Sequence, residues 1–146
     1  MRVSDQPAGR DRASGGDRAP SPWAARALPP LLVVFGLTQL AVGLMLWLAP
    51  GTFFEEIGPF GVRNDHYMGD LATFYLAFGA AGLVAVVRAG WRVPVLTVAF
   101  VAQALHTINH AIDIGETDPG WLGPATLIGV AASTVLVGWM LRVAGR

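Results

Sequence analysis

The sequence contains no cysteine and no lysine, and charged residues make up only 14% of its 146 positions. The lack of cysteine excludes disulfide bonds, thiolate metal ligands and thiol redox chemistry. The chain also lacks a glycine-rich phosphate loop, a nucleophile elbow and a basic stripe for nucleic acid. We therefore expect no nucleic-acid partner, and any chemistry must use histidine, carboxylate, amide or hydroxyl side chains.

Long apolar runs dominate what is present. Hydrophobic residues make up 53% of the chain, and its mean hydropathy is +0.51. Each of four runs approaches the roughly 17–25 residues that cross a bilayer as a helix, and continuous runs of this kind do not build a β-barrel. We predict an all-α fold, an integral membrane four-helix transmembrane bundle, with spans at about residues 30–49, 67–87, 92–114 and 121–141.

The arginines indicate an orientation. Nine of the ten flank one side of the predicted spans, and only Arg63 lies on the other side. By the positive-inside rule, both termini of this multi-pass protein of the cell membrane lie in the cytoplasm. Residues 1–28 are polar and aperiodic, which predicts a disordered cytoplasmic tail before a transmembrane domain at residues 29–146. Pro29 and Pro30 suit the first turn of the first helix.

Two polar clusters interrupt the apolar runs. The first, at the start of the second span, contains Asn64, Asp65, His66 and Asp70. The second, at the end of the third span, contains Gln103, His106, Asn109, His110 and Asp113. Spacings of three and four residues put His66 with Asp70, and His106 with His110, on one helix face. Because the two spans run in opposite directions, we expect the clusters to face each other at the outer-leaflet end.

Ionisable groups at membrane depth are costly, so these clusters predict a functional site. His66, Asp70, His106 and His110 are ligand types for a divalent metal such as zinc, iron or copper. His66 with His106 or His110 would instead suit axial ligation of haem. Without a cofactor, the same residues and Asp113 are candidate catalytic acid–base groups. We expect Asn64, Gln103, Asn109 and Gln39, a glutamine within the first span, to support the site.

These residues favour a small membrane enzyme that acts on a lipid-soluble substrate, such as an isoprenoid, a quinone or a polyketide-like molecule. Its reaction would be metal-assisted, or an acid–base cyclisation or isomerisation. Two other interpretations remain open at this point. One is a metal- or haem-binding accessory subunit of a larger membrane complex, and the other is a structural interaction protein whose polar residues join helices. A homo-oligomer is compatible with each of them.

Residues 50–114 resemble a poorly characterised family of small four-helix membrane proteins from high-GC Gram-positive bacteria, with the pattern N-[ED]-H-x-x-x-D and a later H-x-x-x-H. The matching residues are Gly58-Pro59-Phe60, Asn64-Asp65-His66, Asp70-Leu71-Ala72, His106 and His110. This chain differs by the insertion Gly61-Val62-Arg63 and by Gly69, where the family has arginine. The resemblance implies a four-helix membrane fold and a shared site, but no particular reaction.

Overall fold

The computed structural model describes residues 20–146, and in this range the protein is helical. Its elements are α1 (Pro22–Leu48), α2 (Pro50–Glu56), α3 (Asp65–Val87), η1 (Ala89–Trp91), α4 (Arg92–Ile112) and α5 (Leu122–Ala144). Four of these helices, α1, α3, α4 with η1, and α5, are long and apolar enough to cross a membrane. The predicted all-α fold with four membrane-spanning helices is therefore confirmed, while the short helix α2 was not predicted.

The first helix begins earlier than the sequence predicts. We expected a disordered tail through residue 28, with Pro29 and Pro30 in the first turn, but α1 begins at Pro22 and both prolines lie inside it. Trp23 stacks on Trp139 of α5 with ring centroids 5.7 Å apart, and the neighbouring Ala24 is buried. This packing stabilises the added turns although each proline removes a backbone hydrogen bond. The rest of the predicted tail, residues 1–19, lies outside the described residues.

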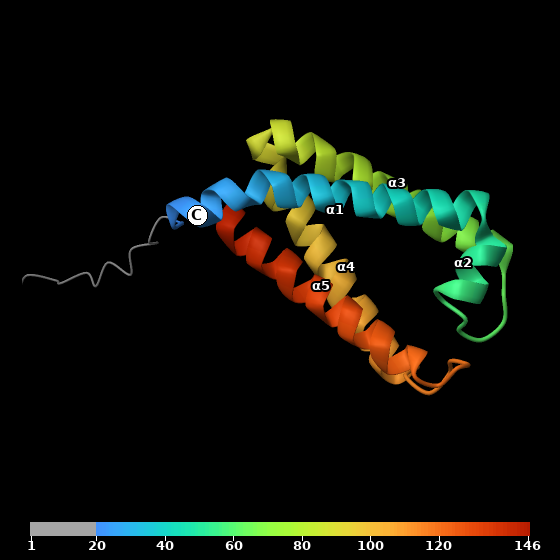
Figure 1. Cartoon of the computed structure of the whole chain (residues 1–146). Helices are drawn as coiled ribbons and strands as arrows, with labels where there is room; N and C mark the ends of the chain where they lie inside the picture. The colour runs from blue at the N-terminus through green and yellow to red at the C-terminus, as the bar shows by residue number, and fades with distance from the viewer. Residues whose placement is uncertain (1–19) are drawn as a thin grey trace, which may run out of the picture.

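The four membrane helices form two pairs, α1 with α3 and α4 with α5 (Figure 1). Glycines bring α1 and α3 together. A Cβ atom at Gly36 would lie 2.8 Å from Leu83 Cδ2, and one at Gly79 would lie 2.6 Å from Leu40 Cγ. Lipid supplies no hydrophobic force between helices, so membrane helices associate where small residues permit close packing. The α1–α3 pair therefore depends on these glycines.

Hydrogen bonds join α4 to α5. Gln103 Nε2 donates to Ser133 Oγ at 2.6 Å, and Thr134 Oγ1 donates to the Gln103 carbonyl at 3.1 Å. The Thr107 and Thr134 hydroxyl oxygens are 2.8 Å apart. Polar contacts of this kind are a second way in which membrane helices associate. Part of the polar face predicted on α4 thus holds the second pair together.

The buried core lies at one end of the molecule, called here the terminal end, where α1 begins and α5 ends. Leu32, Leu96 and Met140 are almost fully buried there. Arg92 also lies at this end and donates to the carbonyls of Ala85 and Val86, both at 3.2 Å, which satisfies the last turn of α3. The α3–α4 connection is thereby fixed as a tight turn.

The two pairs diverge away from this core (Figure 1). The opposite end, called the strap end, contains α2, the α4–α5 loop and residues 57–64, which we call the strap. Phe60 of the strap forms an isolated antiparallel bridge with Thr117 of the α4–α5 loop. Thr117 is buried, and its hydroxyl accepts a hydrogen bond from the Gly123 amide at 2.9 Å. The strap therefore connects the two pairs where the helices themselves are apart.

Large apolar side chains elsewhere on the helices face outward. Val34 of α1, Val87 of α3, Leu105 of α4 and Ile128 of α5 are each more than half exposed. In water such surfaces would be a liability, whereas the hydrocarbon of a bilayer accommodates them. The protein is accordingly a multi-pass membrane protein with lipid around its helices.

Candidate functional site

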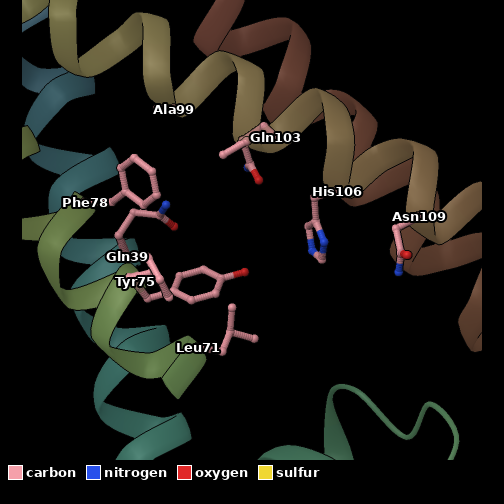
Figure 2. Close-up of a pocket in the computed structure, with 10 residues that line it drawn as sticks. Gln39, Leu71, Tyr75, Phe78, Ala99, Gln103, His106 and Asn109 are labelled. Carbon is pink, nitrogen blue, oxygen red and sulfur yellow. The ribbon is translucent and has the colours of Figure 1, made fainter. Parts of the chain in front are cut away.

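A cavity of about 560 Å³ lies between the two helix pairs. It is lined by one residue of α1, four of α3 and five of α4: Gln39, Leu71, Phe74, Tyr75, Phe78, Ala99, Ala102, Gln103, His106 and Asn109. Figure 2 shows the Tyr75 hydroxyl and the His106 ring projecting toward each other from opposite walls. Its volume and its mixture of apolar wall with a few polar groups are typical of small-molecule pockets.

Two of the five polar side chains in this wall are already hydrogen-bonded. Gln103 donates to Ser133, and Asn109 Nδ2 donates to Asp113 Oδ2 at 3.1 Å. Within residues 20–146, no side-chain hydrogen bond engages Gln39, Tyr75 or His106. These three groups come from three different helices, and they are free to bind a polar group of a molecule in the cavity.

The His106 ring contacts the ring of His110, which lies one helical turn nearer the strap end. The two rings meet edge to face with centroids 4.6 Å apart. His110 meets the ring of Phe60 in the same way at 5.0 Å, so the strap contacts the histidine pair. His110 Nδ1 is buried and, among residues 20–146, has no hydrogen-bond partner. Buried polar atoms are nearly always paired, so this nitrogen is available to form a hydrogen bond.

The predicted cluster at the start of α3 lies outside the cavity. His66 Nε2 is 3.6 Å from Asp70 Oδ2, but the two side chains are 81% and 61% exposed. Asn64 caps α3 by accepting a hydrogen bond from the Tyr67 amide at 3.2 Å. These residues begin the helix, and Asn64 has a local structural role.

Charged side chains also lie at the start of α3 and at the end of α4. Arg63 forms a two-pronged ion pair with Asp65, at 2.6 and 2.9 Å. The hydrogen bond to Asp65 raises the pKa of Arg63 above its ordinary value. Asp113 forms the C-cap of α4 and does not line the cavity. Its contact with the cavity is indirect, through Asn109.

The structure does not gather the predicted metal ligands into one group. We expected His66, Asp70, His106 and His110 to meet, but within residues 20–146 no three His, Asp or Glu side chains are placed to hold one ion. Both clusters lie near the strap end, where the helix pairs diverge, so equal depth does not bring them together. Asp70 is also rotated by about 100° around α3 from its neighbour Leu71, which lines the cavity.

The haem interpretation meets the same difficulty. It required His66 to face His106 or His110 across the space between α3 and α4. His66 does not line that space, and its ring lies instead beside Tyr67 on an exposed surface. The residues of α3 that do face His106 are Leu71 and Tyr75, of which only Tyr75 has a polar group (Figure 2).

Tyr75 is the polar cavity residue that was not predicted from the sequence. A single tyrosine in an apolar helix is usually a packing or interfacial residue. Its distance of four residues from Leu71 and three from Phe78 puts all three on one face of α3. This spacing is visible in the sequence, but the sequence does not show which face of α3 meets α4.

Comparison with protein-family models, with curated proteins and with solved structures finds no match to this chain. The family resemblance of residues 50–114 therefore stays a prediction. The function of the cavity has to be inferred from its own residues.

Proposed function

We propose that the protein is a small membrane enzyme that binds a lipid-soluble substrate in the cavity between the helix pairs and acts on it by acid–base chemistry. The observation that carries this proposal is the convergence of His106, Tyr75 and Gln39 in a largely apolar cavity at membrane depth. Polar groups in this environment are costly to maintain. A molecule that uses them would account for their presence.

His106 is the proposed catalytic residue. Imidazole both donates and accepts protons near neutral pH. In a cyclisation or isomerisation, it would donate a proton to one substrate atom and remove a proton from another, so that no net proton is consumed. The Tyr75 hydroxyl and the Gln39 amide would hold a substrate oxygen in place, and the phenylalanine walls would exclude water.

His110 would extend this proton path. Its ring lies against His106, and its Nδ1 atom has no protein partner among the described residues. A proton received by His106 could pass through an intervening water to His110, toward the strap end. In this proposal the histidine pair connects the cavity with solvent at the strap.

The proposed orientation follows from the arginines of the described chain. Arg26, Arg88, Arg92 and Arg142 lie near the terminal end, whereas Arg63 lies at the strap end. The positive-inside rule then directs both termini to the cytoplasm and the strap to the opposite side. The cavity would lie in the outer half of the bilayer, and a lipid-soluble substrate would reach it from the membrane.

Solvent deuterium provides a test that does not require a known substrate. Purified protein in lipid nanodiscs is incubated in D₂O with a lipid extract of its source cell, and lipids are analysed by mass spectrometry. Acid–base catalysis would place deuterium at a carbon position of one lipid class. Because a positioned acid–base group contributes typically 10²–10⁴-fold, His106→Ala should reduce the rate by about that factor. Tyr75→Phe should also slow it.

The matched control is Ile108→Ala, which changes an exposed, lipid-facing residue of the same helix. It should leave the deuterium uptake unchanged. Uptake that is equal in wild type and His106→Ala, or absent from both, would overturn the proposal.

A further inference from the structure

A second hollow, of about 340 Å³, adjoins the cavity between α3 and α4. We call it the α3–α4 groove. It shares Phe74 and Phe78 with the cavity, and its other walls are Ala77, Ala81, Trp91, Pro94, Val95 and Val98. The two hollows therefore meet at two phenylalanine rings, with the cavity toward the strap end and the groove toward the terminal end.

The polar groups are confined to one of these hollows. Gln39, Tyr75, Gln103, His106 and Asn109 line the cavity, whereas the groove is lined by apolar and aromatic side chains. At a rise of 1.5 Å per residue, His106 is roughly 22 Å along α4 from Trp91. The combined space is thus elongated, with hydrogen-bonding groups at one end and hydrocarbon along the rest.

Side-chain size creates the groove. Its α3 wall includes the small side chains of Ala77 and Ala81, one turn apart, and its α4 wall includes Pro94, Val95 and Val98. A hydrocarbon chain is a suitable occupant for an apolar groove of this volume. Because a hydrocarbon tail gains little by leaving lipid for protein, the groove would select its occupant by shape.

We infer that the substrate is a neutral single-chain amphiphile, whose polar end binds at His106 and Tyr75 and whose hydrocarbon tail lies in the α3–α4 groove. This inference rests on the proposed function and specifies its substrate class. Among the described residues that line either hollow there is no arginine or lysine, so a phosphate headgroup would have no permanently charged partner. An isoprenoid or fatty alcohol has the required form, and an ordinary two-chain phospholipid does not.

Photocrosslinking tests the placement of both ends. The probes are two long-chain fatty alcohols, one with a diazirine beside the hydroxyl and one with a diazirine at the chain terminus. Each is irradiated with the full-length protein in nanodiscs, and labelled residues are identified by mass spectrometry. We expect the first probe to label the region of Tyr75 and His106, and the second to label Trp91 and Pro94. Excess unlabelled alcohol should remove both labels.

A substitution that fills the groove tests whether the hydrocarbon tail lies there. Ala77→Trp introduces a large ring into the groove, so the terminal probe should lose its label at Trp91 and Pro94 while the hydroxyl-end probe still labels near His106. Ala80→Trp is the matched control, since Ala80 is an exposed alanine of the same helix that lines neither hollow. Ala80→Trp should label as wild type does.

The outcomes separate the two proposals. Saturable labelling near His106 with terminal labels scattered over lipid-facing residues such as Val101 would overturn the tail position and leave the cavity as a binding site. Unchanged terminal labelling in Ala77→Trp would overturn it equally. If neither probe labels the cavity in a saturable way, both this inference and the proposed lipid substrate fail.

Discussion

Replacement of Gly79 by alanine should weaken the α1–α3 pair. The added Cβ atom would lie 2.6 Å from Leu40 Cγ and 2.9 Å from the Gly36 carbonyl oxygen, and both distances are shorter than a van der Waals contact. Leucine can adjust, but the carbonyl belongs to the backbone of α1. The two helices must therefore move apart, and the close contact along their length is lost.

The size of the effect can be isolated with a second glycine. A Cβ atom at Gly129 of α5 has nothing within 4 Å, so Gly129→Ala adds only the higher helix propensity of alanine. That gain is common to both variants and cancels in their difference. The free energy of unfolding of Gly79→Ala should consequently be about 1–3 kcal/mol below that of Gly129→Ala, the usual cost of overpacking.

Titration with SDS in mixed micelles, followed by circular dichroism, measures both free energies. Equal values for the two variants would refute the reasoning, because they would show that α1 and α3 do not approach as closely as their glycines indicate. The same conclusion would follow if Gly129→Ala lowered the free energy of unfolding as much as Gly79→Ala does.

Two further predictions concern the α4–α5 pair and the strap. Ser133→Ala removes the hydrogen bond from Gln103, and the same SDS titration should show a loss of about 0.6 kcal/mol, the average for such bonds in membranes; a loss well above 2 kcal/mol would contradict it. Phe60→Ala removes the ring that contacts His110, so amide hydrogen exchange measured by mass spectrometry should increase in the strap and around Thr117 but not within the four long helices. Equal exchange in the strap of wild type and variant would count against its docking role.

The sequence predicted the helices well because their signal is local. Each span needs only a long enough apolar run, and Asn64 before α3 is a recognisable cap. The predicted start of α1 was wrong because it depends on a contact that is not local. Trp23 and Ala24 become helical because they pack against α5, a contact between the two ends of the chain that no local pattern reports.

In the candidate site too, the features that depend on local spacing were predicted, and those that depend on packing between helices were not. Helical periodicity put Gln103, His106, His110 and Asp113 on one face of α4. Of these, Gln103 and His106 line the cavity, together with the flanking residue Asn109. The relation between α3 and α4 depends on the rotation of each helix about its axis, and α3 is oriented by the packing of Gly79 against α1. The sequence could not supply that rotation, so it selected His66 and Asp70 where the structure has Leu71 and Tyr75.

The position of the buried core gives the protein unequal width across the bilayer. The helices are gathered at the terminal end and spread at the strap end, so the protein displaces more area from one leaflet than from the other (Figure 1). The cavity lies between the two pairs, so a change of lateral pressure in that leaflet would act on the spacing of the pairs and, with it, on the width of the cavity.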